Sequence, residues 1–299
     1  MDHQRTILLT GATGYVGGRL LPDLLAAGHR VRCLVRDPSR ARGLPDGAEL
    51  VQGDVVSGDG LAGALAGADV AYYLVHSMGN GSGGDFARRD RDAAATFGRA
   101  VRDAGVARTI YLGGLEDDAG GRSEHLRSRN EVAEVLRELV PELVHVRAAM
   151  VVGDGSASFQ MLRSLVDRLP AMVCPRWIDT RTQPVAIADV RKALAALATA
   201  PQVPEEVQLG GADVLTYRDM LRRYARLAGR REPVIVRVPV LSPRLSSYWV
   251  GLVTPVDAGL ARPLVEGLSA EMLVRQAPPA GINDAPLGFD EAVRRALDG

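Results

Sequence analysis

The stretch Thr6-Ile7-Leu8-Leu9-Thr10-Gly11-Ala12-Thr13-Gly14-Tyr15-Val16-Gly17 places three glycines between a short apolar run and a helical pattern. At a strand-to-helix turn, Gly11 permits the sharp bend, Gly14 lets the backbone approach a ligand, and Gly17 allows helix and strand to pack closely. Free N–H groups at the helix start and the positive end of its dipole attract an anion. The pattern predicts a loop that cradles the pyrophosphate of a dinucleotide, formed by Gly11, Ala12, Thr13, Gly14, Tyr15, Val16 and Gly17.

The residues after this loop continue to alternate short apolar runs with helical spacing. The runs predict strands at residues 5–10, 30–36, 48–52, 70–75, 108–113 and 143–151. Apolar residues recur three and four apart at residues 15–27, 58–66, 86–105 and 124–139, which predicts helices there. Such alternation is typical of βαβ units, so we expect an α/β fold, a doubly wound parallel sheet of the Rossmann type, over residues 1–152.

From about residue 152 the alternation weakens. Helices are predicted at residues 157–169, 189–199, 216–228 and 290–297. Five prolines within residues 233–263 favour ordered loops over long regular elements, and residues 276–286 are expected to form an exposed connection. We expect residues 153–299 to form a smaller C-terminal lobe that completes the substrate pocket and is partly interleaved with the first domain.

The composition limits the classes of partner. Because 36 basic side chains balance 36 acidic ones, neither nucleic acid nor an anionic membrane is indicated, and a small molecule is the expected partner. The two cysteines, Cys33 and Cys174, have no metal-ligand or disulfide-rich spacing, so we expect two buried thiols and no metal. The N-terminus lacks a secretory pattern, and no apolar run reaches the ~20 residues of a membrane span. A cytoplasmic location is expected, and a homodimer is compatible with the sequence.

The residue after the second predicted strand bears on which dinucleotide is bound. An NAD-specific domain usually has an acidic residue there to bind the ribose 2′-hydroxyl, whereas Arg36 suits a 2′-phosphate. We therefore expect NADP(H) rather than NAD(H). Arg40 and Arg42 either add charge at this position or are surface residues, and Asp37 next to Arg36 complicates the argument.

Two further strand ends are predicted to lie at the cofactor. Asp54 and Val55 follow the third predicted strand, where the Asp54 carboxylate either accepts a hydrogen bond from the adenine amino group or belongs to an ordinary turn. Leu74, Val75 and His76 end the fourth predicted strand, at the carboxyl edge of the sheet where ligands bind. The glycine-rich residues 77–84 are either a loop that closes over substrate or an uninvolved one. Trp177 and Trp249 either line the substrate pocket or pack in the core.

The loop has the form TGxxGxxG and resembles that of the short-chain dehydrogenase/reductase superfamily, in particular its extended and NmrA-like branches. Residues 53–55, 104–112 and 183–190 extend the similarity. The segments 73–79, 111–115 and 125–129 are most similar to the atypical NAD(P)H-binding group of NmrA-like and YbjT-like proteins. This resemblance covers most of the chain. It implies a Rossmann fold and NAD(P)H-dependent oxidoreductase chemistry without indicating a substrate.

The chain departs from the superfamily at its catalytic positions. A standard member has Ser or Thr at the end of the fifth strand and Tyr-x-x-x-Lys on the next helix. Here Gly113 and Gly114 stand at the first position, and His125-x-x-x-Arg129 stands at the second. Lys192, the only lysine, is preceded four residues earlier by Ala188, so the chain contains no Tyr-x-x-x-Lys.

His125 and Arg129 are the candidate catalytic pair. Their spacing of four places both on one helical face. The imidazole can pass a proton to a carbonyl, and the guanidinium of Arg129 can hold the nicotinamide ribose hydroxyls. However, His125 lies in the first turn after Ser123, the expected N-cap, where the helix dipole disfavours a protonated imidazole. Two interpretations stay open: the pair only lines the cofactor site, or His125 also transfers a proton.

Three function classes fit these observations. The leading hypothesis is an NADPH-dependent reductase of a small carbonyl or quinone-like acceptor. The alternative is a non-catalytic NADP(H)-binding redox sensor, which the missing Tyr and Lys favour. An epimerase with tightly held NAD fits less well, because Arg36 suits the 2′-phosphate.

Overall fold

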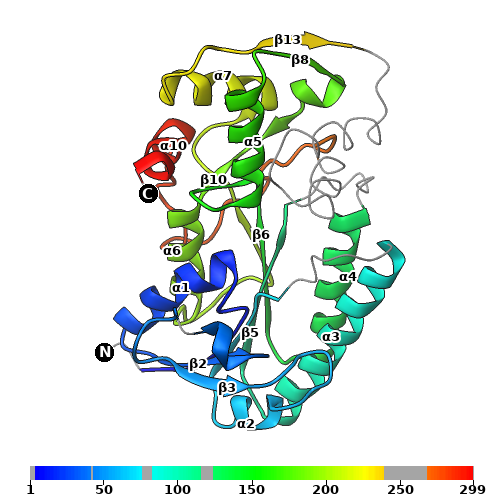
Figure 1. The fold of residues 1–299 in the computed structure, drawn as a ribbon. Coiled ribbons are helices and arrows are strands. Elements are labelled where there is room, and N and C mark those ends of the chain that lie inside the picture. The colour runs from blue at the N-terminus through cyan, green and yellow to red at the C-terminus, as the bar shows by residue number, and fades with distance from the viewer. Residues whose placement is uncertain (1–3, 42, 76–82, 116–123, 239–267, 299) are drawn as a thin grey trace.

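The computed structural model describes residues 4–41, 43–75, 83–115, 124–238 and 268–298 (Figure 1). Within them, the main sheet has seven parallel strands in the order β11-β6-β5-β4-β1-β2-β3. This order confirms the predicted doubly wound Rossmann sheet. The strands are β1 (Thr6–Thr10), β2 (Arg30–Val35), β3 (Glu49–Gln52), β4 (Val70–Tyr73), β5 (Arg108–Gly114), β6 (Leu143–Ala148) and β11 (Glu206–Leu209).

Helices cover both faces of this sheet (Figure 1). One face carries α1 (Tyr15–Ala26) and α6 (Ile187–Leu197), which pack against each other. The other carries α2 (Leu61–Leu65), α3 (Gly83–Asp103) and α4 (Glu124–Leu139). A short 3-10 helix, η1 (Pro38–Ala41), lies between β2 and β3.

The first strand shows why its sequence is apolar without interruption. Ile7 and Leu9 pack in the core beneath α1 and α6, whereas Leu8 points into the core beneath α3 and α4. All three are fully buried. A parallel strand covered on both faces needs apolar residues on both, so the run Ile7-Leu8-Leu9 lacks the alternation of a half-exposed strand.

The remaining elements form a second lobe with its own core, at the top of Figure 1. Its helices are α5 (Ala157–Arg168), η2 (Arg176–Asp179), α7 (Tyr217–Leu227) and α10 (Phe289–Asp298). Three pairs of short strands complete it: β7 (Val151–Val152) with β10 (Val185–Ala186), β8 (Ala171–Cys174) with β13 (Val234–Arg237), and β9 (Arg181–Thr182) with β12 (Leu215–Thr216). The core side chains include Phe159, Leu162, Met220, Tyr224, Phe289 and Val293.

The strand expected over residues 143–151 is too long. β6 ends at Ala148, and β7 leaves the main sheet to pair with β10. Residues 233–263 were expected to be loops, but β13 occupies Val234–Arg237 and pairs with β8; residues 239–267 lie outside the described residues. The apolar pattern alone does not distinguish a strand from a strand followed by a sheet change.

The seventh strand was not predicted. β11 follows α6 and pairs with β6 at the edge of the sheet. Its residues Glu206 and Gln208 break the apolar run because they face polar groups: Arg147 Nη1 donates to Glu206 Oε1 over 3.0 Å. Thus α6 and β11 lie beyond residue 152 in the chain but pack in the sheet layer. The domain boundary at residue 152 remains a prediction.

The structure also shows where the two cysteines and the single lysine lie. Cys33 and Cys174 are buried free thiols, as expected. Lys192 is exposed on α6. Across the described residues, none of the helices combines the length and apolar character needed to cross a membrane.

Gly113 on β5 lies beside the buried imidazole of His145 on β6. A Cβ at Gly113 would lie 2.5 Å from His145 Nε2. His145 is only 3% exposed, and its ring stacks on Tyr111 with centroids 5.2 Å apart. Burial, assisted by Arg147, lowers the pKa of His145 to about 3, so the imidazole is neutral at neutral pH. The packed histidine therefore leaves room only for glycine at residue 113.

We predict that Gly113→Ala lowers the free energy of unfolding by about 1–3 kcal/mol, because the added methyl group must displace the His145 ring. The penalty should largely disappear in a His145→Ala background, which a double-mutant cycle of urea denaturation measures. Gly63→Ala on α2 is the control, since a Cβ there meets no atom within 4 Å. Equal penalties in both backgrounds would show that His145 is not the obstacle.

Candidate functional site

The glycine loop lies at the topological switch point of the sheet. From β1 the chain crosses to β2 on one side, and β4 pairs with β1 on the other. Gly11 has φ +74°, a conformation that side chains rarely adopt, and a Cβ there would lie 2.6 Å from the Leu74 carbonyl oxygen. The loop therefore packs directly on the end of β4, in the crevice where doubly wound sheets bind ligands.

The other two glycines differ in their surroundings. A Cβ at Gly17 would collide with the Gly11 carbonyl, so its close contact is with the loop itself. Gly14 is exposed, and its N–H donates to Gly11 O over 2.9 Å. Gly14 is also the N-cap of α1 and makes no side-chain cap hydrogen bond. The uncapped first turn of α1 thus presents N–H groups at an open backbone surface, which fits a pyrophosphate.

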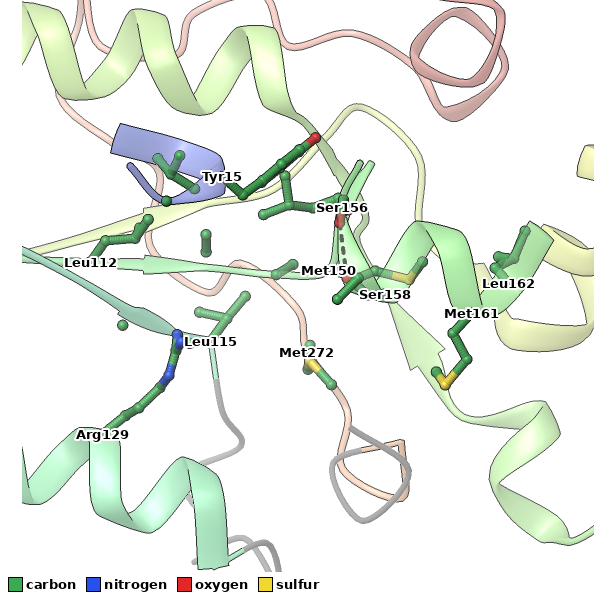
Figure 2. A pocket seen from close by; sticks show the side chains of 18 of the residues that line it. Tyr15, Leu112, Leu115, Arg129, Met150, Ser156, Ser158, Met161, Leu162 and Met272 are labelled. Carbon is green, nitrogen blue, oxygen red and sulfur yellow. Dashed lines mark hydrogen bonds between the residues drawn. The ribbon is translucent and has the colours of Figure 1, made fainter. Parts of the chain in front are cut away.

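A cavity of about 450 Å³ begins at this loop (Figure 2). Gly11, Gly14, Tyr15, Val16 and Gly17 form its entrance wall. The ends of the neighbouring strands continue it through Leu74, Val75, Leu112, Gly113, Ala148 and Met150. Because the carboxyl ends of β1, β4, β5 and β6 meet at one edge of the sheet, residues far apart in the sequence line one space.

Arg129 brings a positive charge to this cavity. Figure 2 shows its side chain extending from α4 toward the end of β5. Arg129 Nε is buried without a hydrogen-bond partner among the described residues. Its carbonyl oxygen accepts a hydrogen bond from Tyr111 Oη over 3.1 Å, which fixes the helix turn against β5. A buried donor without a partner is suited to a ligand hydroxyl or anion.

Tyr15 forms the opposite wall (Figure 2). The guanidinium carbon of Arg19 lies 4.2 Å from the ring centroid, and Arg19 Nη2 donates to Asp154 O over 2.8 Å. The hydroxyl of Tyr15 packs so closely on Gly153 that no Cβ fits there. Burial is the main reason that the pKa of Tyr15 rises to about 12, so the phenol is neutral. These contacts fasten the loop after β7 to the start of α1.

Beyond this point the cavity extends into the second lobe and becomes apolar. Its walls there are Met161, Leu162, Leu165, Trp177, Leu221 and Leu268. Ser156 and Ser158 lie at the transition, with their Oγ atoms 3.3 Å apart (Figure 2). Ser156 Oγ donates to Val151 O over 2.7 Å. Trp177 thus lines the cavity and also belongs to the core of the lobe.

The residues predicted for the adenine half lie outside the cavity lining. Arg36 is exposed after β2, two residues beyond the partner of Thr10 in the sheet register, on the same edge as the glycine loop. The neighbouring Asp37 accepts hydrogen bonds from Ser39 N and Oγ, at 2.9 and 2.7 Å. Asp54 Oδ1 accepts from Val56 N over 2.8 Å, the bond of an ordinary Asx turn, and Val55 is buried.

The structure describes only some of the other residues predicted for the site. Ala12 is buried and Thr13 exposed within the loop. His125 belongs to α4, one turn before Arg129, but its side chain lies outside what the structure describes. His76, Ser123 and Trp249 also lie outside the described residues, as do Arg42 and the side chain of Arg40. The roles assigned to all these residues remain predictions.

Most residues of the apolar wall could not be identified from the sequence. Met161, Leu162 and Leu165 have the spacing of an ordinary amphipathic helix, which predicts core packing as readily as a pocket. Leu221 belongs to α7, whereas Leu268 and Met272 belong to the segment after residue 267, and only the fold brings them together. Met150 could have been noticed, because it follows the sixth strand at the ligand-binding edge of the sheet.

Comparison with known proteins agrees with this geometry. Residues 11–150 match the family model described as NAD(P)H-binding. The ceramide reductase of Caulobacter vibrioides is 27% identical over 271 residues, which span 87% of this chain and 84% of that protein. At this coverage the match extends into the second lobe.

Solved structures show the same fold at lower identity. The NADP(H) complex of triphenylmethane reductase from Citrobacter sp. superposes with a TM-score of 0.75 at 19% identity, covering 97% of this chain and 100% of that one. The NADPH complex of the NADPH-dependent quinone oxidoreductase from Escherichia coli gives a TM-score of 0.74 at 18% identity, with 97% and 99% covered. These comparisons show that residues 11–150 are similar to the NAD(P)H-binding family and that the chain shares the Rossmann fold of the two solved structures.

Proposed function

We propose that the protein is an NADPH-dependent reductase of a carbonyl or quinone-like acceptor. The observation that carries this proposal is the continuous cavity that runs from the glycine loop into the second lobe. A dinucleotide whose pyrophosphate rests on the loop would place its nicotinamide end in the same cavity as an acceptor. The relatives are named as reductases of ceramide, triphenylmethane and quinone, which have reduction but no substrate class in common.

The chain itself would bind and orient the reactants. Bound NADPH supplies a hydride for transfer to the acceptor. The glycine loop would hold the pyrophosphate, and Arg129 would bind the nicotinamide ribose from the α4 side of the cavity. The apolar walls exclude water from the space between the two reactants, which protects a hydride donor from side reactions. Orientation in an enclosed site is the main contribution expected from the protein.

The proton that completes carbonyl reduction has to reach the substrate oxygen. Gly113 replaces the usual Ser or Thr, and His145 fills the space where such a side chain would lie. His145 is a poor donor because its pKa of about 3 leaves it neutral. His125, one helical turn before Arg129, remains the candidate donor, with His76 or water as the alternatives.

The surroundings of Arg36 support a preference for NADPH. In an NAD-specific domain, an acidic side chain after the second strand would bind the ribose hydroxyl. Here the acidic neighbour Asp37 accepts two hydrogen bonds from Ser39. Arg36 is exposed at the edge that carries the glycine loop, where its guanidinium would face a 2′-phosphate.

A second candidate function is an NADP(H)-binding redox sensor without turnover. The absence of Tyr-x-x-x-Lys and the glycine at residue 113 favour it. A sensor needs cofactor binding but no acceptor pocket, whereas this cavity continues well past the loop into the second lobe. A screen of carbonyls and quinones separates the two functions, because tight NADPH binding with no acceptor reduced would support the sensor.

We predict that NADPH binds at least about tenfold more tightly than NADH, and that Arg36→Ala removes most of the difference. The loss of a charge-assisted contact to phosphate should weaken NADPH binding and leave NADH binding unchanged. Fluorescence titration of both cofactors measures this. Arg32→Ala is the control, because Arg32 lies on β2 just before Arg36 but forms an ion pair with Glu49 on β3. Equal affinities of the unmodified protein for NADPH and NADH would contradict the assignment.

Gly14→Val should abolish dinucleotide binding and leave the fold intact. Gly14 is exposed, and a Cβ there would meet only the Gly11 carbonyl oxygen, at 3.1 Å, so a valine side chain would occupy the space of the pyrophosphate rather than that of the core. Calorimetric titration with NADPH and a thermal unfolding scan measure the two effects. Gly63→Val on α2 is the matched control. If Gly14→Val bound NADPH normally, the pyrophosphate site would lie elsewhere.

His125→Ala should lower turnover by roughly 10²- to 10⁴-fold, the range for a lost general acid, and leave NADPH affinity almost unchanged. Arg129→Ala should instead weaken NADPH binding, because its proposed partner is the ribose. Steady-state kinetics with an acceptor that the unmodified protein reduces distinguishes the two. Full turnover by His125→Ala would assign the proton to water or to another group such as His76.

A further inference from the structure

The lobe half of the cavity is more apolar than a site for a small carbonyl requires. Met161, Leu162 and Leu165 on α5 face Leu221 on α7 and Leu268 across the space. All five are nevertheless buried members of the lobe core, each at most 7% exposed. Because these buried apolar side chains line a cavity, apolar groups of a ligand can bind between them.

One polar group in this apolar half has no partner. Trp177 lies on η2 and is only 8% exposed, with its ring edge-on to Tyr217 at a centroid distance of 5.9 Å. Its indole Nε1 is buried and makes no hydrogen bond to any described residue. A buried N–H without an acceptor destabilises a protein, and indole N–H groups usually find one. Trp177 lines the cavity, so a ligand atom can meet this need.

We propose that the second substrate is an elongated, mainly apolar carbonyl compound whose distal part carries a hydrogen-bond acceptor for the Trp177 indole N–H. This inference rests on the proposed reductase function and names the substrate class of the same site. The carbonyl lies at the strand ends near Arg129, Gly113 and Met150. The apolar part crosses to the leucines and methionines of the lobe, and Trp177 fixes its length. Trp177 is a specificity residue here, distant from the reacting atoms.

The affinity of a ligand for this cavity should depend on the length of its alkyl chain. Each methylene buried in an apolar cavity improves affinity about fourfold until the space is full. An acceptor that meets a buried, otherwise unpartnered donor adds roughly tenfold at the one chain length that reaches it. A pocket built for a small carbonyl would show neither effect.

The test measures binding separately from turnover. Dissociation constants of 2-alkanones from 2-butanone to 2-dodecanone are measured by calorimetry with the NADP⁺-loaded protein, in which no ketone is reduced. A second series ends in a methyl ester, CH3CO(CH2)nCO2CH3, and is compared with plain ketones of equal length. We expect about fourfold tighter binding per methylene, and an ester advantage of roughly tenfold at one or two lengths.

Variants assign these effects to the residues. Trp177→Phe should remove the ester advantage and preserve the dependence on chain length. Leu162→Phe and Leu165→Phe, which fill the cavity, should end that dependence at shorter chains and leave NADPH affinity unchanged. Met220→Leu is the control, a volume-conserving change in the same core at a residue that does not line the cavity. If Trp177→Phe does not fold, the two cavity-filling variants still test the apolar site.

The outcomes separate this inference from the proposed function. Length-dependent binding without oxidation of NADPH would support the lobe site and refute the reductase. Reduction of 2-butanone as efficiently as 2-dodecanone, with no gain in affinity along the series, would support the reductase and overturn the elongated substrate. An ester advantage that survives Trp177→Phe would overturn the role of the indole.

Discussion

The close packing of the glycine loop on the end of β4 is the constraint on which the rest of the site depends. Gly11 has to adopt a positive φ against the Leu74 carbonyl, and Gly17 has to pack on Gly11 itself. Any side chain at either position would lift α1 away from the sheet. Because the loop lies flat, the uncapped start of α1 points along the carboxyl edge of the strands. Tyr15 is then directed toward Gly153, and Arg19 reaches Asp154 O, so the same turn also positions the second lobe.

The two lobes contribute different kinds of side chain to the cavity lining. The strand ends and α4 contribute backbone groups and the Arg129 guanidinium, which suit a polar cofactor. The second lobe contributes leucines, methionines and the Trp177 ring, which suit an apolar acceptor. The second lobe is also held by the main sheet layer, because α6 and β11 return to it between elements of the lobe. Because of this interleaving, the cavity wall from the sheet and the wall from the second lobe are held in a fixed orientation. A fixed orientation favours a reaction between two bound molecules.

The glycine at residue 113 has a structural explanation. The imidazole of His145 occupies the space where a side chain at residue 113 would begin, and burial keeps that imidazole neutral. A serine at residue 113 would therefore collide with that ring. In its place, the chain has a stacked pair of buried rings, Tyr111 and His145, with Arg129 held above them through the Tyr111 hydroxyl. The positive charge in the cavity lining, that of Arg129, comes from α4.

The sequence by itself determined the Rossmann fold, six of its sheet strands and the position of the glycine loop. These are local patterns: three glycines at fixed spacing, apolar runs buried on both faces, and helices with one apolar face. Only the tertiary structure decided where β6 ends, that Glu206–Leu209 adds a seventh strand, and which leucines of the second lobe line a cavity rather than fill a core. The spacing within α5 is the same for a solid core and a hollow one. The difference depends on whether α7 and the segment after residue 267 approach it closely, and those contacts join residues far apart in the chain.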